Sequence, residues 1–229
     1  MMFGMAIEWM LILIVGGLGA LVQWRLRAAF RKYGKVLSPG GLTGAQIAQK
    51  MLHDNGIFDV PITCIDGQLT DHYDPTRKTV NLSHDVYMTN SVSAAAVAAH
   101  ECGHAVQHKT GYAPLRLRSL LVPAVNISSM VSQFVILIGI VLIHVFPLLF
   151  WIGITLFCAV LLFAVITLPV EFNASRRALA WLRTSKSLSG KELGMAKSAL
   201  AWAASTYVIA ALSSLATLIY YLGFSRRNT

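Results

Sequence analysis

Charged side chains are scarce in this 229-residue chain. Only 13% of its residues are Asp, Glu, Lys or Arg, and only ten are acidic. A soluble globular domain averages about 25% charged and about 45–50% apolar residues, whereas 55% of this chain is hydrophobic. These proportions argue against an ordinary soluble domain and favour a smaller domain combined with membrane helices.

Cysteine is also rare. The chain has three cysteines, Cys64, Cys102 and Cys158, an odd number at wide spacing. Small secreted domains that depend on disulfide bonds carry an even set at close spacing. We therefore expect no disulfide framework in this protein.

Four apolar runs are long enough to cross a bilayer, which requires about 20 predominantly apolar residues per helix. The runs are Met5–Trp24, Leu120–Val145, Pro147–Val170 and Tyr207–Phe224. No Lys or Arg precedes the first run and no small-residue cleavage site follows it, which argues against a signal peptide. We therefore predict four transmembrane helices, the first of them a retained anchor.

Basic residues gather beside these runs and account for the net charge of +9. They follow the first run (Arg25, Arg27, Arg31, Lys32 and Lys35) and the third (Arg176, Arg177 and Arg183), and outnumber Arg226 and Arg227 at the far end. The positive-inside rule then places 25–118 and 171–205 in the cytoplasm. The positive charge therefore indicates a lipid bilayer as partner, and no nucleic-acid-binding pattern accompanies it.

The expected fold is a mainly α, polytopic membrane protein with a small α+β cytoplasmic domain. We expect an anchor and basic segment (1–35), the α+β domain (36–118), a transmembrane hairpin (119–170), cytoplasmic helices (171–205) and a last transmembrane helix (206–229). In the α+β domain, Thr43 and Gln46 form a capping box that begins a helix. Strand-like pieces at Val60–Ile65, Leu69–Tyr73 and Thr79–Leu82 predict a small sheet or hairpin pair, and alanine predicts a helix over Ser91–His108.

An HExxH motif, with His100, Glu101 and His104, lies inside this alanine-rich helix. Residues four apart lie on one helix face, so both imidazoles can bind one Zn²⁺ ion. The glutamate between them is placed as a general base that takes a proton from the water that zinc activates. Because the motif is short, an ordinary helix with two such histidines is the alternative.

A catalytic zinc ion needs a third protein ligand. Gln107 and Thr110 stand where a metzincin has glycine and histidine, which excludes that class. His108 is on the same helix face, but it lies about 6 Å from His104 along the axis at 1.5 Å per residue. That spacing is awkward for one tetrahedral ion, and a polar residue at the membrane interface is the plainer interpretation.

Glu171 is the stronger candidate for the third ligand. Beyond residue 85 the chain has no aspartate, and its only glutamates are Glu101, Glu171 and Glu192. A carboxylate at the end of a hydrophobic span is costly unless it is paired or bound to a metal. A capping box accounts for Glu192. For Glu171, an ion pair with Arg176 or Arg177 stays open.

Two separated segments resemble the motifs of the YugP-like bacterial membrane zinc metallopeptidases. They are AAHECGHAVQH at 98–108 and EFNASRRA at 171–178, and LTGA at 42–45 and LTDHYDP at 69–75 are also similar to that family. The resemblance runs from about residue 40 to the C-terminus. It implies one zinc ion per chain, held by His100, His104 and Glu171, with Glu101 as the base.

More distantly, the chain resembles the HtpX-type membrane proteases of the gluzincin group, whose second motif is E-x-x-A-D. This resemblance implies a gluzincin-like cytoplasmic domain. Ser175 stands where those enzymes have the aspartate that orients a ligand histidine. We expect Ser175 or Asn173 to take this role more weakly.

His72 and Tyr73 lie on a predicted strand that can run beside the site and hold an extended peptide along its edge. Either side chain can then stabilise an oxyanion. The alternative is that both are ordinary side chains of a hairpin, and only geometry decides between the two interpretations.

Together these residues predict a zinc-dependent endopeptidase at the cytoplasmic face of the bacterial inner membrane, acting on membrane or membrane-near polypeptides. A site-2-type protease would need an aspartate on a later span, which the chain lacks, and spans with almost no charge do not suit a transporter. The remaining alternative is a non-catalytic zinc-binding scaffold or regulator, against which Glu101 argues. The sequence leaves open the substrate, and whether other membrane proteins or further copies of the chain assemble around it.

Overall fold

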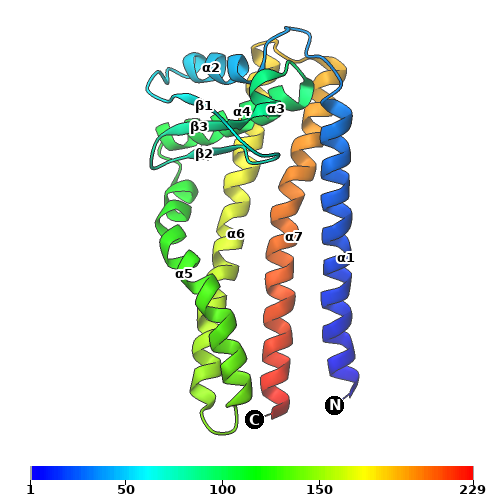
Figure 1. Ribbon diagram of the computed structural model, residues 1–229, viewed down its shortest axis with the longest axis vertical. Coiled ribbons are helices and arrows are strands. Elements are labelled where there is room, and N and C mark those ends of the chain that lie inside the picture. The colour runs from blue at the N-terminus through cyan, green and yellow to red at the C-terminus, as the bar shows by residue number, and fades with distance from the viewer. Residues whose placement is uncertain (1, 229) are drawn as a thin grey trace. The chain divides into compact units, whose positions relative to one another are not determined.

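The computed structural model describes residues 2–228, and the side chains of residues 6–227 (Figure 1). The helices are α1 (Met2–Tyr33), α2 (Gly44–Asp54), α3 (His84–Met88), α4 (Val92–Lys109), α5 (Ala113–Val141), α6 (Pro147–Thr184) and α7 (Gly190–Asn228). The strands are β1 (Ile62–Ile65), β2 (His72–Asp74) and β3 (Thr79–Ser83).

Four of the described helices, α1, α5, α6 and α7, are long and apolar enough to cross a membrane. They contain the four apolar runs, and α6 continues well past the third run, from Pro147 to Thr184. A mainly helical chain with four candidate membrane helices and a small sheet is therefore confirmed. The predicted domain boundaries and the orientation in the membrane stay predictions.

The chain divides into two compact units, and the first holds most of the apolar helical sequence. It comprises three segments: the part of α1 up to Val22, Leu117–Leu168, and the part of α7 from Thr206 onward. Within it, α5 and α6 pack closely because Gly139 lacks a side chain: a Cβ there would come within 2.6 Å of the Phe150 backbone nitrogen. Phe150 is fully buried, in a cluster with Ile136 and Phe157.

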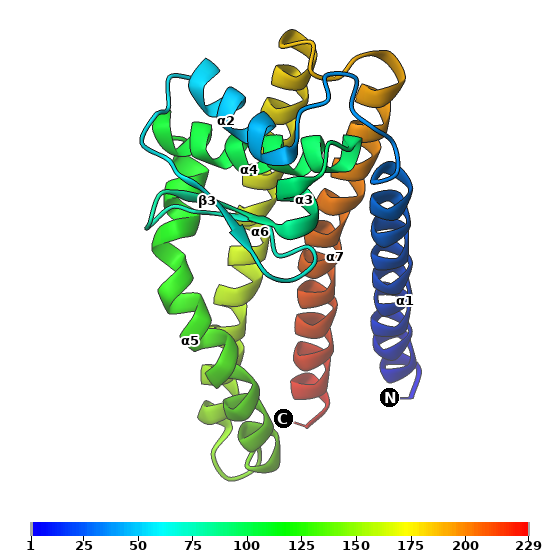
Figure 2. The ribbon, with the colours of Figure 1, turned by 45° about the horizontal axis from the view of Figure 1, so that its top comes forward.

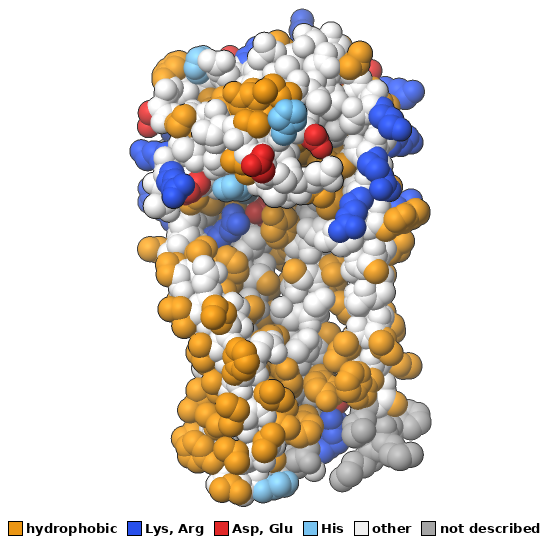
Figure 3. Space-filling view, in the orientation of Figure 1, with side chains coloured by type: hydrophobic (Ala, Val, Ile, Leu, Met, Phe, Trp, Pro, Cys, Tyr) orange, Lys and Arg blue, Asp and Glu red, His pale blue; other side chains and the backbone are white. Residues whose placement is uncertain are grey.

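Within the same unit, α1 and α7 run side by side (Figures 1 and 2). The Arg227 guanidinium donates to both oxygens of Glu8, each at 2.8 Å, and this bidentate pair joins the far ends of the two helices. Hydrophobic side chains dominate the outer face of the unit (Figure 3). Exposed examples are Leu120, Met130, Phe134, Val141 and Trp151. Such a face suits lipid rather than water.

The second unit comprises Gln23–Arg116 and Pro169–Ser205, and it has its own hydrophobic core. Helix α4 runs through this core, with a run of alanines that are almost fully buried and with Val92 and Cys102 completely so. Small side chains let α2, α3, β2 and β3 all pack against α4. The sulfur of Cys102 faces the carbonyl oxygen of Ala48 on α2, at 3.5 Å.

The sheet has the strand order β1-β3-β2, with β1 parallel and β2 antiparallel to β3. The consecutive strands β2 and β3 form a hairpin, as one expectation had it, whereas β1 and β2 do not pair across the turn at Gly67. A sheet of three strands is confirmed. Its two edges are β1 and β2, and β2 also contacts α4.

Local signals set the boundaries of α2 and α4 as expected. The Thr43 side chain accepts from the Gln46 backbone and the Gln46 side chain accepts from the Thr43 backbone, so the capping box that begins α2 is confirmed. Gly56, with φ of +67°, follows the end of α2, and Ser91 caps α4. Helix α3, five residues long, was not predicted.

Candidate metal centre

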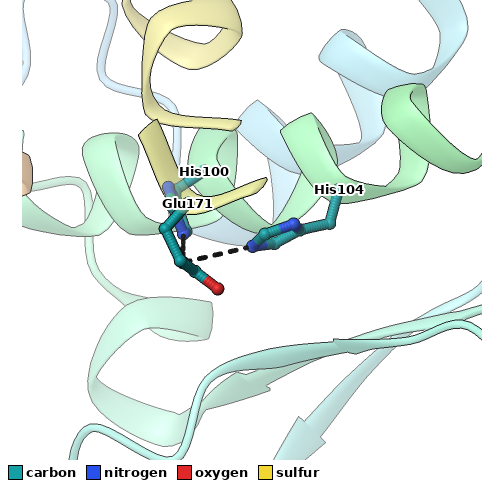
Figure 4. Close-up of side chains that lie close together, drawn as sticks. All are labelled: His100, His104 and Glu171. Atoms are coloured by element: carbon teal, nitrogen blue, oxygen red, sulfur yellow. Dashed lines mark hydrogen bonds and ion pairs between the residues drawn. The ribbon is translucent and has the colours of Figure 1, made fainter. Parts of the chain in front are cut away.

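Three side chains from two helices converge on one point (Figure 4). His100 and His104 project from α4, and Glu171 projects from α6. The Glu171 Oε2 atom lies 3.2 Å from His100 Nε2 and 3.6 Å from His104 Nε2. One ligand atom from each residue lies within 4.8 Å of the others, and the three form a group that can hold a metal ion. The sequence thus identified three residues that lie together although 71 positions separate the first from the last.

A close approach of α4 to α6 makes this convergence possible. Gly103 lies against Ala174, and a Cβ on Gly103 would come within 2.7 Å of the Ala174 carbonyl oxygen. The glycine inside the HExxH motif therefore lets the two backbones touch, one helical turn from Glu171. Val170, Glu171 and Ala174 are all buried at this contact.

Each histidine has a second hydrogen-bond partner, at Nδ1, on the side away from Glu171. His100 Nδ1 lies 3.1 Å from Ser175 Oγ, and His104 Nδ1 lies 3.0 Å from Gln107 Oε1. Such partners fix the ring orientation of metal-binding histidines and leave Nε2 for the metal. Ser175 therefore lies where the sequence predicted a supporting residue.

Asn173 does not contact a ligand histidine in the described structure; its Oδ1 atom accepts from Gln107 at 3.0 Å and from Arg177 at 2.8 Å. Gln107 is the partner that the sequence reasoning missed, because its role depends on how α4 and α6 cross. The only available signal was its position, three residues after His104 on one helix face.

Glu101, the predicted base, is buried, with 8% of its surface exposed. The pKa of Glu101 is raised to about 7, mainly by burial: His100 opposes the shift, and the Glu171 and Asp71 carboxylates contribute to it. The backbone of Tyr73 on β2 lowers the pKa of this carboxyl group slightly. A carboxyl group that titrates near neutrality is suited to accept and return protons.

The donor set fits zinc. Two imidazole nitrogens and one carboxylate oxygen are a common ligand set of catalytic zinc sites, which keep one further position open. The three residues are buried or nearly so, and both histidines have supporting hydrogen bonds. The three residues present therefore fit a zinc ion.

The other candidate side chains lie on β2 and on the last turn of α4. The Tyr73 hydroxyl is 2.7 Å from His108 Nδ1. Burial, followed by Asp59 and Asp74, raises the pKa of Tyr73 to about 12, so this hydroxyl remains protonated at neutral pH and can donate. The side chain of His72 is exposed and lies near the Thr70 carbonyl and the Asn81 amide, so the structure does not bring it to the three ligands. His108 is likewise not part of the metal-binding group.

Comparison with known proteins identifies the family of the chain. Residues 8–226 match the family described as "Putative neutral zinc metallopeptidase". The chain belongs to this family. It is 44% identical over 206 residues, covering 90% of this chain and 91% of the relative, to the "Putative membrane protease YugP" of Bacillus subtilis (strain 168). No solved structure matches the chain.

Membership of this family implies zinc as the metal, and the relative's name describes a membrane protease. The resemblance seen in the sequence is therefore confirmed at the level of the family. The four apolar helices agree with an association with membranes. The roles of the individual residues rest on the geometry described above.

Proposed function

We propose that this chain is a zinc-dependent, membrane-bound endopeptidase of the gluzincin type, with its site at the cytoplasmic face of the bacterial inner membrane. The observation that carries the proposal is the convergence of His100 and His104 on α4 with Glu171 on α6. Glu101 lies in the same buried region, with a pKa near neutrality.

In the proposed reaction, His100, His104 and Glu171 hold one zinc ion. Bound there, zinc would polarise the scissile carbonyl group and make a nearby water molecule more acidic. Glu101 takes the proton from that water as the water attacks the peptide bond, and then delivers a proton to the leaving amine.

The position of β2 suggests where a polypeptide substrate binds. Strand β2 forms one edge of the sheet and contacts α4, which carries the HExxH motif. An extended polypeptide can add to such an edge through its main chain. Tyr73 and His72 on this strand are the candidates for stabilising an oxyanion. Each has another partner in this structure: the Tyr73 hydroxyl lies 2.7 Å from His108 Nδ1, and the His72 ring lies near the Thr70 carbonyl and the Asn81 amide. Either side chain would have to leave its partner to contact the substrate.

The membrane orientation in the proposal follows from charge. Basic residues follow the first and third apolar runs, and the positive-inside rule places those flanks in the cytoplasm. Arg227, which opposed that assignment, is paired with Glu8 and so contributes less free positive charge at its end of the chain. Substrates in membranes or close to them are the natural class for an enzyme anchored in this way.

The second candidate is a non-catalytic zinc-binding membrane scaffold or regulator. It requires the metal ligands but has no use for a general base. The buried Glu101 next to the ligands favours the peptidase, because burial of a carboxyl group without a role is costly.

The experiment that separates the two candidates compares wild type with Glu101→Gln. Casein and membrane-protein substrates are incubated with each purified protein, and zinc content is measured in both. We expect Glu101→Gln to retain zinc and to lose at least about a hundredfold in cleavage rate, as loss of a general base does. Glu192→Gln makes the same chemical change on α7 and is expected to cleave like wild type.

Equal cleavage by wild type and Glu101→Gln would remove the peptidase assignment. Zinc bound by both proteins with cleavage by neither would favour the scaffold.

A further inference from the structure

Gln107 is a fully buried polar side chain between the two metal-binding helices. Its Oε1 atom lies 3.0 Å from His104 Nδ1 on the same helix. Its Nε2 atom donates to the Val170 carbonyl oxygen at 2.8 Å and to Asn173 Oδ1 at 3.0 Å, both on α6. One amide group therefore joins a ligand histidine to the residue directly before the ligand glutamate.

The orientation of this amide follows from its neighbours. Arg177 Nε can only donate, and it donates to Asn173 Oδ1 at 2.8 Å, so that oxygen must face Arg177 and accept. The Val170 carbonyl also only accepts. Turning the Gln107 amide over would place its oxygen against these two acceptors, which is unfavourable for buried groups. The Gln107 oxygen must therefore face His104.

The ring of His104 is fixed as a result. An amide oxygen accepts only, so the hydrogen bond forms with the proton of His104 on Nδ1. The lone pair of the imidazole is then on Nε2, the atom that lies 3.6 Å from Glu171 Oε2. The hydrogen-bonded series from Arg177 through Asn173 and Gln107 thus determines which nitrogen of His104 is free to bind a cation.

We infer that Gln107 is a positioning residue of the metal centre: it holds His104 with Nε2 available as a ligand and fixes the start of the Glu171 segment against α4. The inference rests on the proposed function, because it takes His104 and Glu171 as zinc ligands. It adds a residue within the HExxH helix, three positions beyond the motif, to the machinery of the site.

Zinc affinity is the first test. The full-length protein in detergent is freed of metal and titrated with Zn²⁺ against a competing chromogenic chelator. Gln107→Leu keeps the size of the side chain but removes its hydrogen bonds, and we expect the zinc dissociation constant to rise by about 10- to 100-fold, the usual effect of losing a partner of a ligand histidine. Gln49→Leu makes the same change at an exposed site on α2 and is expected to bind like wild type.

A second control shows whether Gln107→Leu lowers zinc affinity only because it destabilises the protein. Val106→Ala, a buried neighbour on α4 that contributes only packing, serves as the reference, and we expect it to lower the unfolding temperature without changing zinc affinity. Gln107→Leu with wild-type zinc affinity would overturn the inference.

Nitrogen-15 NMR of histidine-labelled, zinc-free wild type gives an independent test that does not require Gln107→Leu to fold. The ring of His104 is assigned from the signals missing in His104→Gln. The pH is raised until the nitrogen chemical shifts of His104 are those of a neutral ring, and we then expect its proton on Nδ1. A proton on Nε2 would overturn the inference.

The proposed function has a separate control in the same titration. If Glu171→Ala bound zinc as tightly as wild type, the metal site itself would be wrong. If Glu171→Ala lost zinc while Gln107→Leu did not, the metal site would stand and only the positioning role of Gln107 would be wrong.

Discussion

Gly103 and Ala174 touch through their backbones: a Cβ on Gly103 would lie 2.7 Å from the Ala174 carbonyl oxygen and 3.1 Å from its Cα. The contact lies beside the proposed metal ligands, His100 and His104 on α4 and Glu171 on α6. Because the obstacle is backbone rather than a flexible side chain, a larger residue at 103 must move one helix. The distance between the two halves of the metal centre therefore depends on this glycine.

Replacing Gly103 with alanine should separate the ligands. Overpacking of this kind costs about 1–3 kcal/mol, and we expect zinc affinity to fall by about tenfold or more because Glu171 moves away from both histidines. The measurement is chelator competition on the purified protein. Gly194→Ala on α7 is the matched control, since a Cβ there meets nothing within 4 Å. Unchanged zinc binding by Gly103→Ala would show that the helices can adjust without loss of the site.

The stability of the zinc-free protein should depend on pH through Glu101. Its pKa is raised by burial from 4.5 to about 7 in the folded protein, whereas the unfolded chain keeps the lower value. Between these values the folded state binds a proton that the unfolded state has released. The free energy of unfolding therefore falls as pH rises from about 4.5 to about 7, by about 3 kcal/mol at about 1.4 kcal/mol per pKa unit.

Unfolding of the chelator-treated protein at pH 5 and pH 8 measures this difference. Glu101→Gln cannot titrate at this position and should lose most of the dependence. Asp71, whose pKa burial also raises, remains in the variant and leaves a smaller slope of the same sign. An identical pH dependence in wild type and Glu101→Gln would contradict the raised pKa of Glu101.

The orientation in the membrane can be read from the native cysteines. Cys64 is exposed on β1, Cys102 is buried, and Cys158 is exposed on an apolar part of α6 where a membrane would surround it. A membrane-impermeant maleimide should therefore label Cys64 in inverted vesicles and not in right-side-out vesicles. Cys64→Ser should abolish the label. Labelling of Cys64 from the outside would reverse the proposed topology.

Local patterns in the sequence were sufficient for much of the fold. The capping box of Thr43 and Gln46 begins α2 as predicted, because such a cap involves residues only three apart. The four long apolar helices follow from composition. The spacing of His100 and His104 places both on one face of α4, since helical periodicity is also a local property.

Contacts between distant segments were harder to predict. The sheet order β1-β3-β2 could not be read from the turn at Gly67, because strand pairing depends on residues far apart in the chain. The position of Glu171 beside the two histidines followed from the scarcity of acidic residues and from a family resemblance. Gln107 carried no comparable signal, since its partners Val170 and Asn173 become neighbours only when α4 and α6 cross.

The most direct test of the metal centre is the zinc content of wild type, Glu171→Ala and His108→Ala after identical purification. His108→Ala is the matched control, because His108 lies on the same helix but bonds to Tyr73 rather than to the three ligands. We predict about one zinc ion per chain in wild type and His108→Ala, and little in Glu171→Ala. Zinc retained in Glu171→Ala but lost in His108→Ala would contradict the account and assign the third ligand to His108.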